Sequence, residues 1–196
     1  MSGYGDVKSE DGKDLNADGY APTLTGQCVK GNKIISLEFP EFNGAVSHDA
    51  AVLKFEQSNG ATFQHRITGS SEGWAMDKTK REMLHICSKI VTKEEYQAAI
   101  AGSTGFVDFI GRIKANVLPK AEGKTFSLKL VYKLSKDKTK AFVNFPAFPN
   151  FIELDGTEPS TFSTDPKYDI YEMPALGAPE TTGAPMPGDA VADAPF

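Results

Sequence analysis

The stretch AVLKFEQSNGATFQHRI, residues 51–67, decides how this sequence begins to fold. Apolar and polar side chains alternate on both sides of Asn59-Gly60, which is the alternation of a half-buried strand. Asn-Gly is the strongest short-range signal for a tight turn between two antiparallel strands. The sequence therefore predicts a β-hairpin whose inward face consists of Leu53, Phe55, Phe63, His65 and Ile67.

Further strands are predicted on either side of this hairpin. QCVKGNKIISLEF, residues 27–39, contains a turn signal at Lys30-Gly31-Asn32, followed by Ile35, Leu37 and Phe39 on one face. RIKANVL, residues 112–118, reads as a strand with Ile113, Ala115 and Val117 inward. TFSLKLVYKL, residues 125–134, reads as a longer one. Its inward residues are Phe126, Leu128, Leu130, Tyr132 and Leu134, and Lys129 and Lys133 are expected to face outward.

Helical signals separate the two groups of strands. DKTKREMLHICSKIV, residues 77–91, has apolar residues at helical spacing and Asp77 as the expected cap. TKEEYQAAIAG, residues 92–102, begins with a capping box of Thr92 and Glu95, and Gly102 is the expected stop. A short helical turn is expected from Phe106 to Ile110, closed by Gly111.

This order of elements predicts a mainly β protein with a helical insertion, arranged as an OB-fold-like five-stranded barrel. The folded domain is expected at residues 23–172, because the flanking segments contain few apolar side chains. Residues 1–22 are rich in Gly, Asp, Ser and Lys and predict a flexible arm. Residues 173–196 carry repeated prolines and predict a disordered, Pro/Gly-rich acidic tail.

A stripe of aromatic residues follows the last long strand. AFVNFPAFPNF, residues 141–151, places a Phe at every third position with prolines between them. Such spacing favours an extended path with three residues per turn, so that all four rings share one side. The simplest interpretation is packing over the core, and Phe148 is in addition a candidate for base stacking.

The net charge of −5 is distributed unevenly along the chain. Residues 19–149 contain eighteen Lys and Arg against twelve acids, and residues 112–140 contain nine basic residues against two acids. From residue 150 onward, nine acids accompany one lysine. A basic body with an acidic end favours a polyanionic ligand and a tail that competes with it; charge placed for solubility is the alternative.

Outward lysines and arginines on the strands can follow a phosphate backbone, and aromatic rings can stack on bases. Trp74 lies in a Gly-rich stretch, TGSSEGWAM, and is the best single stacking candidate; a place in the core is the alternative for it. A solvated face is the alternative for the basic residues. The candidate nucleic-acid contacts are Lys54, Arg66, Trp74, Arg112, Lys114, Lys129, Lys133 and Phe148.

Enzymatic activity is not expected. The three histidines are scattered, and no nucleophile elbow, phosphate-binding loop or dinucleotide fingerprint occurs. DLNADG, residues 14–19, matches the opening of a calcium loop, but Thr25 stands where the bidentate Glu is required. We therefore expect no metal and no cofactor. The sequence contains no run of 18 apolar residues and no secretory signal, and its two cysteines read as free thiols, which predicts a cytoplasmic protein without a membrane span.

The chain ends in GDAVADAPF, residues 188–196. A basic body with OB-like strand order, a Pro/Gly-rich linker and this acidic tip resembles single-stranded DNA-binding proteins of bacteria and phages. The segments DFIGRIKANVL and KTFSLKLVYKL also resemble small phage replication proteins of this class. The resemblance implies that the tip recruits partner proteins through Asp189, Asp193, Pro195 and Phe196. The tip has only two acids, fewer than such tails usually carry.

The function predicted from these observations is sequence-independent binding of single-stranded DNA in phage replication, recombination or repair. Partners of the tail would be replication or recombination proteins. The alternative function is that of a virion structural or assembly protein that uses the β-rich body for subunit contacts. A calcium-dependent binding module is a third possibility, and it requires the DLNADG loop to be ordered.

Overall fold

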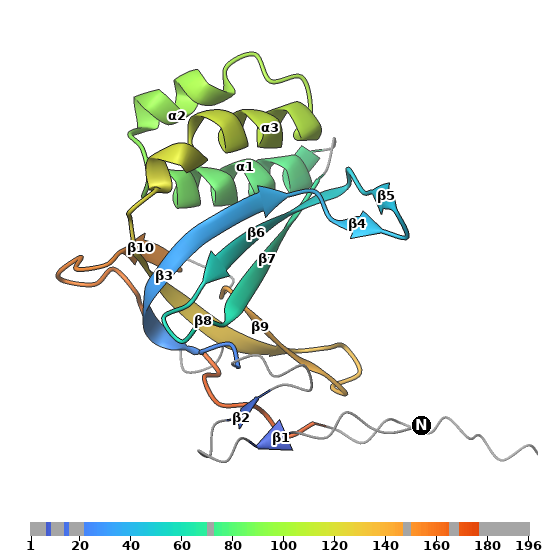
Figure 1. The fold of residues 1–196 in the computed structure, drawn as a ribbon, viewed down its shortest axis with the longest axis vertical. Helices are drawn as coiled ribbons and strands as arrows, with labels where there is room; N and C mark the ends of the chain where they lie inside the picture. The colour runs from blue at the N-terminus through green and yellow to red at the C-terminus, as the bar shows by residue number, and fades with distance from the viewer. Residues whose placement is uncertain are drawn as a thin grey trace, which may run out of the picture.

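The computed structural model describes residues 7–8, 14–15, 22–69, 73–146, 150–164 and 169–176 (Figure 1). Its elements are, in chain order, β1 (Val7–Lys8), β2 (Asp14–Leu15), β3 (Gly26–Glu38), β4 (Glu41–Phe42), β5 (Ala45–Val46), β6 (Ala50–Glu56), β7 (Thr62–Thr68), α1 (Gly73–Cys87), α2 (Lys93–Ile100), α3 (Phe106–Asn116), a 3-10 turn (Leu118–Ala121), β8 (Phe126–Leu134), β9 (Ala141–Asn144) and β10 (Ile152–Leu154).

Six strands form one antiparallel sheet. The order is β10–β8–β3–β6–β7, and β9 pairs with β8 beside this path. In the described part of the chain β7 and β9 do not pair with each other, so the sheet is open. The prediction of a mainly β body with a helical insertion is confirmed, whereas the closed five-stranded barrel is not.

The hairpin β6–β7 forms as the sequence predicts. Every residue from Ala50 to Glu56 has a partner in β7, and the turn is closed by a hydrogen bond from the Gln57 N–H to the Ala61 carbonyl, 2.8 Å. Gly60 has a φ of +82°, a conformation that costs glycine little. The expected inward residues Leu53, Phe55, Phe63, His65 and Ile67 are all buried.

The predicted turn at Lys30-Gly31-Asn32 is wrong, because β3 runs through it without ending. Gly31 does adopt a positive φ of +78°, but its N–H donates to Asp155 Oδ2 at 2.9 Å. A second irregularity between Ile34 and Ser36 shifts the register against β6. Ile35 is consequently 51% exposed while Leu37 is fully buried, so these two residues do not share a face as expected.

Three helices connect β7 to β8. α1 begins at Gly73, four residues before the expected cap at Asp77. α2 has the predicted capping box: the Glu95 N–H donates to Thr92 Oγ1, and the Thr92 N–H donates to Glu95 Oε2. Gly102, with a φ of +72°, follows its end.

The strand predicted at residues 112–118 is wrong, because this segment belongs to α3. α3 continues through Gly111, where the sequence predicted an end. Ile113 and Val117 are buried and Ala115 is exposed. Positions i and i+4 fit one face of a helix and also one face of a strand, so only the exposure of Ala115 distinguishes the two. Arg112 and Lys114 are therefore helical residues.

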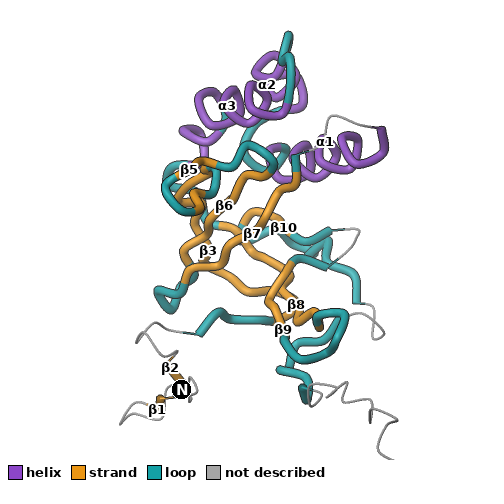
Figure 2. Tube along the Cα trace, turned by 90° about the vertical axis from the view of Figure 1, so that its right-hand side faces the viewer, coloured by secondary structure: helices purple, strands orange, loops and turns teal. Residues whose placement is uncertain are grey.

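The helices gather at one end of the molecule, near the end of the sheet formed by β3, β6 and β7 (Figures 1 and 2). Met83 and Ile86 of α1 and Ile110 and Ile113 of α3 enter the same hydrophobic core as the inward residues of the sheet. The β8–β9 hairpin lies toward the opposite end (Figure 2). This arrangement leaves the hairpin largely uncovered by helices.

Candidate nucleic-acid interface

The β8–β9 hairpin presents a basic turn. Lys136, Lys138 and Lys140 are exposed, and Lys133 is exposed where β8 ends. None of these four lysines takes part in an ion pair with another described residue. The chain between residues 133 and 142 thus offers four ammonium groups that are available to an external anion.

The single acid of this turn, Asp137, is held by the turn itself. The Ser135 hydroxyl and the Thr139 N–H both donate to Asp137 Oδ1. These hydrogen bonds lower the pKa of Asp137 to about 2, the Ser135 bond having the larger effect. The Lys140 N–H donates to Ser135 Oγ at 3.0 Å and closes the loop. The carboxylate therefore shapes the turn, and no ion pair joins it to the lysines beside it.

An exposed aromatic ring faces one of these lysines. Phe142 lies directly opposite Lys133 in the antiparallel register of β8 and β9, and it is 54% exposed. Residues directly opposite on one face have Cβ atoms about 4.5–5.5 Å apart. A lysine and an exposed aromatic residue thus occupy neighbouring positions on one face of the hairpin, which is a combination that can take a phosphate and its base.

Charged residues of α1 affect the pKa of Lys133. Partial loss of water around its ammonium group, followed by the positive charge of Lys78, lowers the pKa of Lys133, and the Glu82 carboxylate opposes this. Lys78 is exposed. The two ammonium groups therefore repel each other, and an anion bound between the hairpin and α1 would relieve that repulsion.

Side-chain packing holds the hairpin against β7 where the backbones do not pair. Phe145, just after β9, has its ring centre 4.7 Å from that of His65 and 5.0 Å from that of Phe63. His65 Nε2 in turn lies 2.9 Å from Glu82 Oε1 of α1. The opening between β7 and β9 is therefore bridged by a fixed layer of rings, with Phe142 on the exposed part of β9.

Lys129 corrects one prediction of outward orientation. Its side chain is buried, 1% exposed, and its Nζ donates to Asp169 Oδ2 at 2.7 Å and to the Ser163 carbonyl at 2.6 Å. Ser163 and Asp169, which follow it by 34 and 40 residues in the chain, thus cover the side of β8 that alternation assigns to solvent. Lys129 thus forms a structural ion pair with Asp169 and is not accessible to a phosphate.

The other predicted contacts lie on separate elements. Lys54 of β6 is half-buried and paired with Glu38 at 3.3 Å, and Arg66 is exposed on β7. Arg112 pairs with Asp108 at 2.9 Å, and Lys114 is exposed on α3. The structure therefore does not bring these four residues together with Lys133.

The two predicted aromatic contacts cannot be placed at this site. Trp74 belongs to α1, and its side chain lies outside the described part of the chain, as does Phe148. The expectation that all four rings of the stripe share a side is wrong, because Phe145 and Phe151 are buried while Phe142 is exposed. The tail residues Asp189, Asp193, Pro195 and Phe196 are also outside the described residues.

Residues of the hairpin turn were missed as contacts. Lys136, Lys138 and Lys140 belong to SKDKTK, residues 135–140, a segment that contains none of the contacts predicted from the sequence. The excess of basic residues over residues 112–140 was the signal that could have found them. Phe142 was assigned to the stripe that packs over the core, but it is 54% exposed.

Other kinds of site find little support in the residues described. No helix among them is long and apolar enough to cross a membrane. Across the same residues, no three His, Cys, Asp or Glu side chains are grouped to hold a metal ion. Of the calcium-loop candidate, Asp14 and Leu15 form β2, and residues 16–19 are not described.

Comparisons with protein-family models, with curated protein sequences and with solved structures found no match for this chain.

Proposed function

We propose that this chain binds single-stranded DNA without sequence preference and acts in phage DNA replication or recombination. The observation that carries the proposal is the pair Lys133–Phe142 on a hairpin with three further unpaired lysines. Binding proteins of this kind combine a positive surface that follows the backbone with rings on which bases stack. The hairpin provides both within one element.

In this proposal Lys133, Lys136, Lys138 and Lys140 neutralise phosphates, and Lys78 of α1 adds a fifth charge. Phe142 stacks on a base, since every base has a flat apolar face. Neither contact reads a base edge, so binding is independent of sequence. The protein performs no chemistry on the strand and requires no metal or cofactor.

The strand order supports the same proposal. β3, β6 and β7 form a meander, the helices follow, β8 returns beside β3, and β9 lies beside β8. An OB-fold has this order and closes between its third and fifth strands. We interpret the sheet as an OB-like arrangement that is open at that position, between β7 and β9. The acidic segment at residues 188–196 recruits replication or recombination proteins in this proposal.

A titration of fluorescently labelled oligo-dT with the full chain tests this function. We expect binding at micromolar protein or better that weakens steeply with added salt, because each neutralised phosphate releases a counterion. Oligonucleotides of mixed sequence should bind with similar affinity. Absence of binding at micromolar protein, or binding indifferent to salt, contradicts the proposal.

The exposed ring of Phe142 also favours a second candidate function, assembly of copies of the chain into a virion component. An aromatic ring that is 54% exposed is suited to a subunit contact as well as to a base. Light scattering after size exclusion separates the two functions. Assembly that increases with protein concentration in the absence of DNA supports the second candidate.

A further inference from the structure

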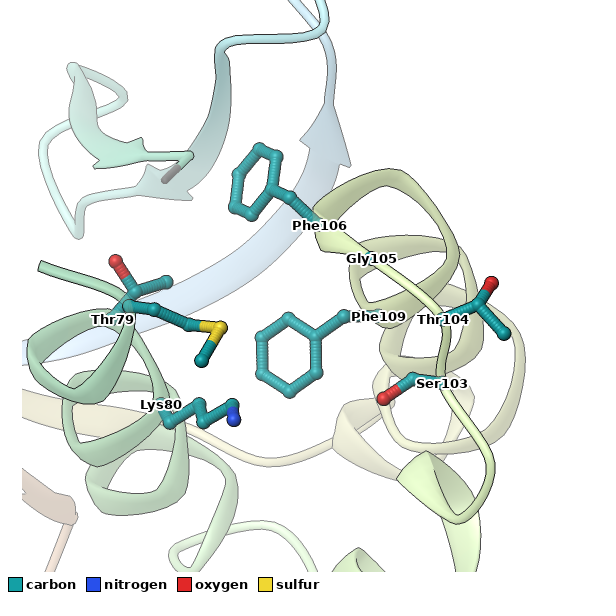
Figure 3. Close-up of a pocket in the computed structure, with 8 residues that line it drawn as sticks. Thr79, Lys80, Ser103, Thr104, Gly105, Phe106 and Phe109 are labelled. Atoms are coloured by element: carbon teal, nitrogen blue, oxygen red, sulfur yellow. The ribbon is translucent and has the colours of Figure 1, made fainter. Parts of the chain in front are cut away.

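A cavity of about 280 Å³ lies between α1 and the beginning of α3 (Figure 3). The Phe109 ring and the Ser103 side chain point toward it (Figure 3), and Met76 of α1 also lines it. Lys80 lies at its edge and is exposed. Ligand cavities are typically roughly 300–1,000 Å³, so this one suits a single flat ring system.

The cavity is preformed. Phe109 is 5% exposed and belongs to the hydrophobic core, and the Phe106 ring packs edge-on against Phe39 at 6.2 Å. Gly69 permits this position of Phe106, because a Cβ at residue 69 would lie 2.5 Å from its Cδ1 atom. A ligand entering the cavity thus meets fixed rings.

The loop along the other side of the cavity is also fixed. The Thr104 N–H donates to Asp108 Oδ2 at 3.0 Å, and Arg112 Nη1 donates to the Ala101 carbonyl at 2.8 Å. These bonds hold the backbone between α2 and α3. A ligand entering beside Ser103 therefore meets a loop that is already ordered.

The charges at the cavity favour an anionic aromatic ligand. Lys80 forms no ion pair within the described residues, and no Asp or Glu is among the described residues that line the cavity. A nucleotide matches this arrangement, since its base can occupy the cavity beside Phe109 while its phosphate meets the Lys80 ammonium group.

The cavity is connected to the DNA-binding hairpin through α1. Lys80 of α1 lines the cavity, and Glu82 of the same helix lies 2.9 Å from His65, whose ring packs against Phe145 just after β9. We propose that the cavity takes one unstacked base of the same DNA strand that the hairpin binds, with the adjoining phosphate at Lys80. This inference rests on the proposed function and adds a second base subsite to it.

A pair of neighbouring substitutions tests the subsite. Ser103 and Thr104 are both exposed, but the Ser103 side chain points toward the cavity and the Thr104 side chain points away from it (Figure 3). Ser103→Phe should therefore fill the cavity, and Thr104→Phe is the matched control. Stacking of one base corresponds to roughly 5- to 140-fold in affinity. We expect that loss for oligo-dT with Ser103→Phe alone.

Further measurements distinguish binding of a base in the cavity from binding of a phosphate at Lys80. Ser103→Phe should leave the affinity for an abasic deoxyribose-phosphate strand of equal length unchanged. An oligo-dT with one 2-aminopurine should show a fluorescence change with the wild type and with Thr104→Phe that is lost with Ser103→Phe. Lys80→Gln provides an independent variant and should lower the salt slope by about 0.7, one single-strand phosphate contact.

The outcomes that overturn the subsite are distinct from those that overturn the function. If the wild type binds oligo-dT and both Phe variants retain its affinity and fluorescence change, the subsite is wrong and the proposed function stands. Equal losses in the two Phe variants also overturn the subsite. If the wild type binds no oligonucleotide, the proposed function and the subsite both fail.

Discussion

Lys129 and Lys133 lie four residues apart on β8, on the same side of the strand by alternation, yet only Lys133 is open to a ligand. Lys129 is buried against Asp169, whereas Lys133 is exposed and paired in register with the exposed Phe142. Ser163 and Asp169 cover Lys129, and no described residue forms an ion pair with Lys133. Strand alternation determines on which face of the sheet a side chain lies. Residues distant in the sequence determine whether that face is exposed to solvent.

The largest difference expected between Lys129 and Lys133 is in the free energy of unfolding of their variants. Lys129→Met keeps most of the apolar stem but leaves Asp169 buried without its ammonium partner. Breaking a buried pair in this way costs about 3–5 kcal/mol of the free energy of unfolding. Lys133→Met at the exposed position should change it by less than about 0.5 kcal/mol. Urea denaturation followed by circular dichroism measures both, and equal losses would contradict the contrast between the two lysines.

The next effect concerns the ring opposite Lys133. Phe142→Ala should weaken binding of oligo-dT by about 1–3 kcal/mol, because one stacked base is lost. Its stability should change little, since Phe142 is 54% exposed. Ile35→Ala, at an apolar residue that is 51% exposed on β3, is the matched control and should leave the affinity unchanged. Equal affinity of Phe142→Ala and the wild type would remove Phe142 from the interface.

The smallest effect is at Asp137. An NMR titration of its carboxyl should give a pKa of about 2, because the Ser135 hydroxyl and the Thr139 N–H stabilise the charged form. Because folding lowers the pKa of Asp137, its carboxylate stabilises the turn at pH values above the ordinary pKa of Asp. This stabilisation is lost as the pH falls through about 2. The hairpin should therefore keep its shape at pH 5. A midpoint near 4 would show that the turn does not hold the carboxylate.

Local signals were sufficient for part of the fold. The Asn59-Gly60 turn with its alternating flanks gave β6–β7, and the spacing of Thr92 and Glu95 gave the start of α2, because both depend on residues close in sequence. α3 was mistaken for a strand because Ile113 and Val117 satisfy both periods. Gly31 was mistaken for a turn because a positive φ also serves an irregular strand.

The candidate site was predicted only at Lys133. The burial of Lys129 depends on Asp169, forty residues later, and no local pattern contains that information. The openness of the sheet likewise depends on how Phe145 packs between β7 and β9. The lysines of the hairpin turn were readable from their density. The sequence could not predict that these lysines form no ion pair, because the Asp137 carboxylate accepts hydrogen bonds from Ser135 and Thr139 instead.

The salt dependence of oligo-dT binding by a triple variant of the hairpin turn tests whether the hairpin binds single-stranded DNA. Lys136→Ala, Lys138→Ala and Lys140→Ala together remove three proposed phosphate contacts. The matched control replaces Lys30, Lys33 and Lys93, which are exposed and form no ion pair with a described residue. We predict that the slope of log K against log salt becomes shallower by about two in the hairpin variant, and that the control keeps the wild-type slope. Equal slopes in the two variants would contradict the assignment of single-stranded DNA binding to the hairpin end of β8.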